Sequence, residues 1–600
     1  MKKFPAFTFL LLCLAILPAQ KLFSQDKAFN KMLDNYYMER MQLIPLEGTQ
    51  SGDSTKNDKL YADFTDSYRA KLSGFFTRYL TSVKKIDRNK LKGNDRIHYD
   101  IFKREMEVSL EGLSRQWFTN FVLYPEHQYM PFNQFGGVPL WMGQLGSGEG
   151  SQPFKSITDY ENWIRRATAF SAWTDSAIIY FRKGIEKNIV LPQTLVKKMI
   201  PQLEEMLVSD PKKSLFYGPV NKMPDNFTNA ERKRFTTDYT KLINEQLVPS
   251  YRKLWSFFKN EYLSKARKTT GISSLADGKK YYEYLIHSWT TTNKTPEEIY
   301  QTGLDEVKRI RAAMDSVRNT VGFKGDLNAF FLFMKTDKRF MPYKTAEEVL
   351  DAYRAIQSKI DPNLKKMFNH TPKTPFEVRQ TEAYRAASAS AEYNMGSVDG
   401  TRPGIFYVPI LDATTFNVTS GMEGLFLHEA IPGHHYQLSL QLENTKLPKF
   451  LRFSFYGAYV EGWGLYSESL GKELGVYTDP YQLIGSLGKE IHRSIRLVVD
   501  VGMHSKNMTR EEAIKYMMEN EPINEQKATA EIERYMAMPG QALSYKIGSI
   551  KIRELRTRHE KMLGKKFDLA AFHDELLQGG SMPLEILEKK MDSWAATKKR

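Results

Sequence analysis

The amino-acid sequence predicts an all-α protein, mainly helical with a minor β element. Apolar residues recur every three to four positions through long segments, which is the period of a buried helix face. Several of these segments begin with helix-capping residues, and strand signals are few. The segments with the helical period are Phe154–Lys187, Leu203–Val208, Ala230–Tyr262, Glu297–Val317, Thr345–Ile360, Pro480–Met508 and Arg510–Glu519.

Two helix starts and one strand follow from local residues. Residues 295–298, Thr-Pro-Glu-Glu, combine a Thr cap with Pro at the first helical position and Glu at the third. Ser420 and Glu423 have the same spacing and predict a helix that starts just before residue 428. Gly404–Ile410 is the best strand candidate and could line a cleft.

The N-terminus has the features of a secretory signal peptide. Lys2 and Lys3 precede an apolar run from Phe7 to Leu17, and small residues follow it. This run is too short to span a bilayer, and no later segment is long enough either. We therefore expect residues 1–24 to be a signal peptide and the protein to be exported, to the periplasm or to the medium.

The remaining chain is expected to form one large helical body with two parts. We predict an N-terminal part over residues 25–285 and a C-terminal part over residues 286–600, which carries the metal motif described below. At 41% hydrophobic and 26% charged residues, the composition is that of an ordinary globular protein.

Cysteine usage and charge exclude other classes. The only cysteine, Cys13, lies in the predicted signal peptide, so the mature chain can have neither disulfides nor thiolate metal sites. The formal net charge is +16, but the basic residues are interspersed with 70 acidic ones, and no nucleic-acid-binding motif is present. A solvated basic surface explains this charge better than a nucleic-acid partner.

Residues 428–435, His-Glu-Ala-Ile-Pro-Gly-His-His, carry the strongest functional signal. Two neutral imidazoles can hold a zinc ion, and a carboxylate beside the first His, here Glu429, can take a proton from water that the metal activates. In the usual His-Glu-x-x-His pattern the two His lie four residues apart on one helix face. Here that position is Pro432, which cannot bind a metal and interrupts a helix. The second ligand must therefore come later than Pro432.

His434 and His435 are both candidates for the second ligand after His428. In an ideal helix His435 would return to the His428 face but lie roughly 10 Å along the axis. One zinc ion, which bonds each imidazole at about 2 Å, spans that distance poorly. A bulge at Pro432-Gly433 that absorbs two residues would bring His434 to the usual place. We favour His434 and keep His435 as the alternative.

A downstream helix supplies candidates for a carboxylate ligand. Glu461 lies 33 residues after His428 and is our third ligand, because zinc hydrolases commonly take a carboxylate from a following helix. Glu468 lies two turns further along the same face, and we expect it to orient a His or a loop. Gly462 and Gly464 cost about 1 kcal/mol each inside a helix relative to Ala, so they predict close packing against another helix.

The alternative to a metal site is a capped core helix that ends in surface histidines, with acidic residues downstream for solubility. Two further stretches could complete a site. His492, Arg496, Asp500 and His504 recur every four residues, either as a buried ion-pair network or as part of the site wall. Tyr535 and Tyr545 flank a Pro-Gly turn.

We assign Tyr545 and His504 to catalysis and Tyr535 to substrate binding. A Tyr hydroxyl or His504 could stabilise the oxyanion that forms when water attacks a carbonyl. Aromatic core packing accounts for either tyrosine equally well.

Five motifs together resemble a bacterial family catalogued as domain of unknown function 885. They are HEAIPGHH (428–435), EGWGLYSE (461–468), DGTRPGIFYVP (399–409), RLVVDVGMH (496–504) and MPGQALSYKIG (538–548). Weaker matches extend the resemblance over most of the chain. The family is distantly similar to helical zinc peptidases of the oligopeptidase and carboxypeptidase type. Its pattern His-Glu-x-x-Pro-Gly-His requires the His after Gly, which is His434 here.

The resemblance implies a helical fold with a deep cleft, one zinc ion per chain and hydrolysis of peptides. Mapped onto this sequence, Glu429 is the general base, and the zinc ligands are His428, His434 and Glu461. Arg402, before the predicted strand, could hold the C-terminal carboxylate of a substrate, with a purely structural role as the alternative.

We thus predict an exported zinc metallopeptidase that acts on short peptides. One alternative is that the same zinc site hydrolyses a non-peptide amide or ester. The other is a helical binding protein in which this segment has no catalytic role.

Overall fold

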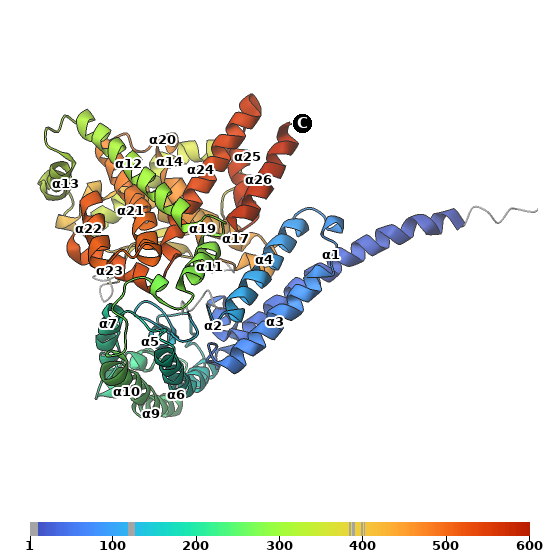
Figure 1. Ribbon diagram of the computed structural model, residues 1–600, viewed down its shortest axis with the longest axis vertical. Coiled ribbons are helices and arrows are strands. Elements are labelled where there is room, and N and C mark those ends of the chain that lie inside the picture. Colours follow the sequence, from blue (N-terminus) through green and yellow to red (C-terminus); the bar gives the residue numbers. More distant parts are fainter. Residues whose placement is uncertain are drawn as a thin grey trace, which may run out of the picture. The chain divides into compact units, whose positions relative to one another are not determined.

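The structure is a computed structural model that describes residues 10–117, 127–382, 386, 390–397, 400 and 402–599 (Figure 1). As predicted, these residues are mainly helical, and they contain one three-stranded sheet. No helix in this part of the chain is long and apolar enough to cross a membrane. The first nine residues of the predicted signal peptide lie outside the described residues.

The chain divides into two compact units. The first comprises residues 1–269 and 274–276, and the second comprises residues 270–273 and 277–600. The boundary predicted at residue 285 falls inside a helix of the second unit, α11 (Gly278–Thr290). The division therefore precedes this helix instead of interrupting it.

The described residues of the first unit form helices joined by loops, without a β-strand, and α3 packs against both α1 and α4 (Figure 1). Its α-helices are α1 (Leu10–Leu43), α2 (Pro45–Gln50), α3 (Asp66–Lys84), α4 (Asp95–Ser114), α5 (Val138–Gly146), α6 (Ile157–Glu186), α7 (Gln193–Glu204), α8 (Gly218–Asn221), α9 (Asn229–Leu242) and α10 (Val248–Phe257). The single helix predicted over Ala230–Tyr262 is two helices joined by a π-helical turn. The helix predicted over Leu203–Val208 is wrong, because α7 ends at Glu204.

The second unit contains all the predicted site residues. Its further α-helices are α12 (Pro296–Thr320), α13 (Leu327–Thr336), α14 (Ala346–Met367), α16 (Met422–Glu429), α17 (His434–Glu443), α18 (Lys449–Arg452), α19 (Gly457–Glu468), α20 (Gly471–Leu474), α21 (Pro480–Ser505), α22 (Arg510–Asn520), α23 (Glu525–Ala537), α24 (Ser544–Leu563), α25 (Leu569–Gln578) and α26 (Leu584–Lys599). α19 packs against α16 and α24, and α21 packs against α12, α16 and α24.

The sheet of the second unit has the strand order β1-β3-β2. β1 (Phe376–Gln380) runs parallel to β3 (Gly404–Val408), and β2 (Glu392–Asn394) runs antiparallel to it. β3 is the strand predicted from the sequence, shortened by two residues at its end. It is the central strand, and four of its five residues are buried.

The two predicted helix starts have different outcomes. At α12, Thr295 and Glu298 form the expected reciprocal capping box. At α16 the prediction is wrong, because the capping residue is Gly421 and not Ser420. Glu423 does not fold back to cap the helix; it accepts a hydrogen bond from the main-chain N–H of Tyr477. Gly421 has a φ of 85°, in the left-handed region that favours glycine.

Close packing of α19 against α24 explains Gly462, the first of its two costly glycines. A Cβ on Gly462 would lie 2.6 Å from the Cα of Gly548 on α24, and a Cβ on Gly548 would lie 1.8 Å from the carbonyl oxygen of Ala458. Such distances are far inside van der Waals contact, so the two helices can approach this closely only because neither residue has a side chain. The predicted close approach of α19 to another helix is confirmed.

Candidate metal centre

The first two candidate ligands meet because the chain folds back between α16 and α17. α16 ends at Glu429 and α17 begins at His434, so the predicted bulge is a full break between two helices. A Cβ on Gly433 would lie 1.9 Å from the carbonyl oxygen of His428, so only glycine fits in this break. The indole N–H of Trp463 on α19 donates to the carbonyl oxygen of Pro432 at 2.8 Å. These contacts hold the break against α19.

His428, His434 and Glu461 form a cluster with the geometry of a metal site. The Nε2 atoms of the two histidines lie 3.6 and 3.5 Å from Oε2 of Glu461. One donor atom from each residue lies within 4.8 Å of the others. Ligands bonded to zinc at 2.0–2.1 Å in a tetrahedron are about 3.3 Å apart. The separations are thus longer than hydrogen bonds and match the edges of such a tetrahedron.

The electrostatics of the cluster call for a cation. Burial alone would raise the pKa of Glu461, but His428 and His434 lower it well below its usual range. Burial alone would lower the pKa of His428, but Glu461 and Glu468 raise it to about 9. A positive charge is therefore strongly favoured between these groups, and a divalent cation would supply it without protonated imidazoles.

Glu468 has the orienting role that its position predicted. Its Oε1 accepts a hydrogen bond from Nδ1 of His428 at 2.8 Å, and its side chain is buried. With the proton on Nδ1, the lone pair of Nε2 points toward Glu461. In zinc proteins a carboxylate that bonds the second ring nitrogen orients a metal-binding histidine in the same way.

His435 lies outside the cluster. Its Nδ1 is 3.0 Å from the hydroxyl of Tyr393 in β2, and its ring packs against Phe376 in β1 with a centroid distance of 4.8 Å. Burial lowers its pKa to about 4, so the ring is neutral. The structure therefore favours His434 over His435 as the second ligand.

Glu429, the predicted general base, follows the candidate ligand His428 directly in the chain. It is the last residue of α16, adjacent to His428 and half-buried. Burial raises the pKa of Glu429, and the charges of His428 and His434 oppose this shift. A carboxylate beside the candidate metal ligands is a group that can accept a proton from water and pass it on.

Tyr545, at the start of α24, also belongs to the centre. Burial raises its pKa, and the negative charge of Glu461 adds to the shift. The guanidinium carbon of Arg496 lies 4.6 Å from the centroid of its ring. Its hydroxyl is thus within electrostatic range of a metal ligand, on a half-buried side chain.

His504 and Tyr535 do not have the predicted roles. Nδ1 of His504 accepts from the main-chain N–H of Ile272, and Nε2 donates to the carbonyl oxygen of Tyr535 at 3.0 Å. His504 is fully buried, so no nitrogen is left for an oxyanion. The Tyr535 hydroxyl accepts from Nε of Arg496 at 2.8 Å and donates to Glu531. Both side chains therefore have structural roles, which corrects the sequence-based assignment.

The polar stripe on α21 is a buried network, the first of the two alternatives. Nδ1 of His492 is 2.9 Å from Glu521, and Arg496 pairs with Glu531 at 3.3 Å. Asp500 accepts hydrogen bonds from the Tyr282 hydroxyl and from the main-chain N–H of Gly540. Only Arg496 also reaches the metal centre, through the ring of Tyr545.

Arg402 is exposed and not part of the cluster. Its main-chain N–H donates to Oγ of Ser397 at 2.9 Å, which holds the turn before β3. Its charge acts on Tyr393, the residue that contacts His435. The structure thus places Arg402 on the His435 side, and substrate binding by this residue stays a prediction.

Lys489 and Arg493 lie near the metal centre but were not among the residues predicted from the sequence. Burial lowers the pKa of Lys489, and the charge of Arg493 adds to this shift. Lys489, Arg493 and Arg496 follow one another at a spacing of four and then three residues, which places them on one face of α21. This spacing could have indicated a cationic face of α21. The polar stripe of residues 492–504 on the same helix was the stronger pattern, so the cationic face was not predicted.

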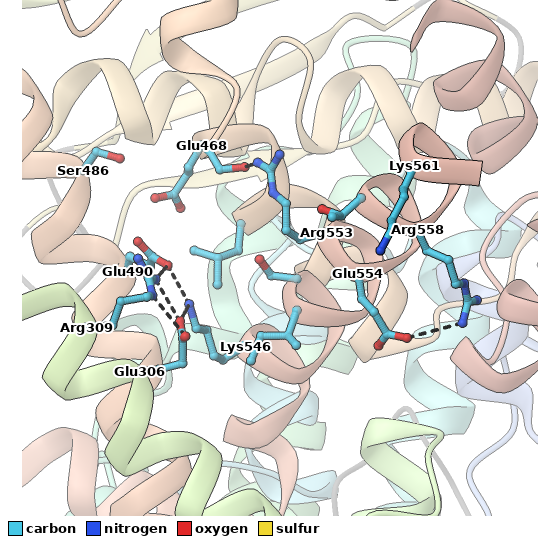
Figure 2. A pocket seen from close by; sticks show the side chains of 15 residues that line it. Glu306, Arg309, Glu468, Ser486, Glu490, Lys546, Arg553, Glu554, Arg558 and Lys561 are labelled. Carbon is cyan, nitrogen blue, oxygen red and sulfur yellow. Dashed lines mark hydrogen bonds and ion pairs between the residues drawn. The ribbon is translucent and has the colours of Figure 1, made fainter. Parts of the chain in front are cut away.

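A cavity of about 810 Å³ is lined by residues of α12, α19, α21 and α24, with Glu468 among them. Figure 2 shows that charged side chains line it. Lys546 and Arg309 pair there with Glu306 and Glu490. His428, His434 and Glu461 do not line this cavity, and Glu468 is the residue that connects it to the metal centre.

Known proteins that resemble this chain share its fold. A crystal structure described as a "putative lipoprotein" from Colwellia psychrerythraea matches with a TM-score of 0.86 and 27% identity, over 96% of this chain and 99% of that one. Another solved structure, described as a "putative lipoprotein of unknown function" from Shewanella oneidensis, matches with a TM-score of 0.72 and 20% identity, over 94% of this chain and 99% of that one. No curated protein matches the chain.

A family pattern covers nearly the whole sequence. Residues 45–591 match the family described as bacterial protein of unknown function, DUF885. The match includes every residue of the metal centre. The chain is therefore a member of the DUF885 family.

Proposed function

We propose that the protein is a zinc-dependent peptidase. The observation that carries this proposal is the convergence of His428, His434 and Glu461 from three helices, with Glu429 next to His428 in the sequence and within range of the charges of both histidines. Two imidazoles and a carboxylate, with a carboxylate base beside them, are the donor set of a catalytic zinc site that keeps one position open. A zinc site with a purely structural role is closed by a fourth protein ligand and does not need such a base.

The chain's own residues divide the work of hydrolysis. When bound, zinc acts as a Lewis acid that makes water nucleophilic at neutral pH and polarises a carbonyl. Glu429 takes the proton of the attacking water and passes it to the leaving amine. The hydroxyl of Tyr545 donates to the oxyanion that forms at the attacked carbonyl. Glu468 keeps the Nε2 lone pair of His428 directed at the metal position.

Short or unfolded peptides are the substrates that this site fits. His428 is 2% exposed and His434 is 9% exposed, so a scissile bond must enter a recess to reach them. An extended chain can do so, whereas a rigid folded protein cannot present its backbone there. We further propose export of the protein, on the basis of the signal-like residues 1–24 and of the lipoprotein descriptions of its structural neighbours.

The test is hydrolysis of a mixture of short peptides by the zinc-loaded chain, followed by mass spectrometry. We expect cleavage by the wild type and loss of at least a hundredfold in Glu429→Gln, since general-base catalysis contributes about 10²–10⁴-fold. A folded protein added to the same mixture should stay intact. If the zinc-loaded wild type cleaved ester or non-peptide amide substrates but no peptide, the peptidase assignment would be wrong and the hydrolase site would stand.

A further inference from the structure

Three cationic side chains lie along one face of α21 beside the metal centre. Lys489, Arg493 and Arg496 are spaced so that each lies about one turn after the last. α21 packs against α16, which carries the ligand His428 and the base Glu429. The charges of these side chains are therefore held next to the reacting groups by helix packing.

Arg493 touches the group that orients the first ligand. Its Nη2 is 3.9 Å from Oε1 of Glu468, the oxygen that accepts the hydrogen bond from His428. Its Nη1 donates to the carbonyl oxygen of Lys489 at 3.1 Å. Its Nε is buried and has no hydrogen-bond partner in the structure. The charge of Arg493 acts on both Glu429 and Tyr545, so the side chain lies within electrostatic range of the proposed base and of the proposed oxyanion donor.

Arg496, one turn later on α21, also has a buried guanidinium nitrogen without a hydrogen-bond partner. It is 7% exposed, and its guanidinium lies over the ring of Tyr545 at 4.6 Å. Nε and Nη2 donate to Tyr535 and Glu531, but Nη1 is buried without a partner. A buried N–H of a charged group that lacks an acceptor is strongly unfavourable, so native structures rarely keep one unless a ligand, an ion or a water supplies the acceptor.

Lys489 adds a third positive charge. Its side chain is half-buried, and it forms no ion pair among the described residues. Its charge interacts with Glu429 and Glu468, which places it at the same centre. Three cationic side chains thus lie on the face of α21 near the metal centre. Two of their guanidinium nitrogens, Nε of Arg493 and Nη1 of Arg496, have no acceptor in the structure.

We propose that Lys489, Arg493 and Arg496 form a subsite that binds a carboxylate of the substrate next to the scissile bond. This inference rests on the proposed peptidase function and names its substrate class. A carboxylate offers two oxygens that can accept from two guanidinium groups at once. In a peptide it is either the free C-terminal carboxylate, which makes the enzyme cut near the carboxyl end, or an Asp or Glu side chain. Neutral peptides leave the buried N–H groups unpaired and are poor substrates.

Three peptides of otherwise identical sequence separate these sources. One has a free C-terminus, one is C-terminally amidated, and one is amidated but has Glu in place of Gln beside the cleaved bond. For the zinc-loaded full-length chain we expect kcat/KM of the amidated neutral peptide to be roughly tenfold to a hundredfold below that of a carboxylate-bearing peptide. Preference for the first peptide identifies the C-terminus, and preference for the third identifies a side chain. Equal rates for all three, within twofold, would overturn the subsite.

In the variants the readout is a ratio: kcat/KM of the preferred carboxylate-bearing peptide divided by kcat/KM of the amidated neutral peptide. This ratio does not depend on the fraction of folded enzyme. Arg493→Gln and Lys489→Met should each bring the ratio toward one, and Arg493→Lys should keep part of it. The control is Lys308→Met, on the exposed face of α12, which should leave the ratio unchanged. Unchanged ratios in Arg493→Gln and Lys489→Met would contradict the assignment of these residues.

A binding measurement tests the subsite without catalysis. Calorimetric titration of the metal-free chain and of zinc-loaded Glu429→Gln with the free-acid and amidated peptides should show about tenfold or more tighter binding of the free acid or of the Glu peptide. Tighter binding without any cleavage by the wild type would refute the peptidase function and keep the subsite. Cleavage with equal binding of all peptides would keep the function and refute the subsite.

Discussion

Nδ1 of His428 donates a hydrogen bond to Oε1 of Glu468 at 2.8 Å, across the contact between α16 and α19. This bond determines which nitrogen of the imidazole faces Glu461 and the metal position. The ligand set therefore depends on a residue that does not itself bind the metal. The same carboxylate is 3.9 Å from Arg493, so one side chain connects the metal ligand to the cationic face of α21.

Removal of the Glu468 carboxylate should weaken zinc binding. We expect Glu468→Ala to lower the zinc affinity about 10- to 100-fold, because partners of this kind contribute that much. Glu468→Gln should lose less, since its amide oxygen can still accept from Nδ1. Competition with a chromogenic chelator measures the affinity, and Glu525→Ala, an exposed carboxylate on α23, is the control. Wild-type affinity in Glu468→Ala would show that the bond does not orient His428.

Gly464 should be essential for the position of His428. A Cβ at residue 464 would lie 2.8–3.0 Å from three atoms of the His428 ring, so Gly464→Ala must displace the imidazole. We expect this variant to lose most of its zinc affinity although Ala is the better helix former. The matched control is Gly488→Ala on α21, where a Cβ meets nothing within 4 Å. Zinc content after dialysis distinguishes the two, and equal content would contradict the packing described here.

The hydroxyl of Tyr545 should contribute to kcat and little to KM. In Tyr545→Phe the ring that Arg496 covers remains, and only the proposed oxyanion donor is lost. Loss of one such donor lowers kcat by about 10²–10³-fold. Steady-state kinetics on one peptide, with the zinc content measured in parallel, tests this. A higher KM at unchanged kcat would mean that the hydroxyl binds the substrate and does not act on the transition state.

Asp500 should make the protein less stable as the pH rises from about 4 to 7. Burial raises the pKa of Asp500 to about 7, although Tyr282, Gly540 and Arg534 oppose the shift. The unfolded chain has a pKa near 3.9 at this residue, so between these values only the unfolded state ionises and the free energy of unfolding falls with pH. Below about pH 4 Asp500 is protonated in both the folded and the unfolded state, so its ionisation no longer lowers the free energy of unfolding.

Asp500→Asn removes the titrating carboxyl group, and with it this pH dependence of stability, while the shape of the side chain is kept. We expect the difference in unfolding free energy, variant minus wild type, to be larger at pH 8 than at pH 5, by roughly 2.6 kcal/mol. Urea denaturation of both proteins with a chelator present measures this difference without any effect of metal. A difference that stays constant between the two pH values would mean that Asp500 is ionised in the folded state throughout.

The helices and the metal motif could be predicted from sequence because their signals are local. The capping box at Thr295 needs only residues 295–298, and the ligand role of Glu461 follows from its residue type and its distance from His428. The Pro432-Gly433 break also pointed to His434, since two extra residues had to be absorbed. In each case the deciding groups are close in sequence or have chemistry that few residue types share.

The errors concern partners that are distant in sequence. Ser420 is not the cap because Glu423 bonds Tyr477, 54 residues later. His504 is not catalytic because both ring nitrogens bond main-chain groups of Ile272 and Tyr535, which no pattern on α21 indicates. Arg493 was missed because its importance lies in its contact with Glu468 and in an unpaired nitrogen, and these follow only from the packing of α19 against its neighbours.

Zinc content of the purified chain tests the central claim most directly. The wild type, Glu461→Ala and His435→Asn would each be incubated with excess zinc, dialysed and analysed by atomic emission. We predict close to one zinc per chain in the wild type and in His435→Asn, and almost none in Glu461→Ala. No zinc in the wild type, or full zinc in Glu461→Ala with loss in His435→Asn, would contradict the centre built from His428, His434 and Glu461.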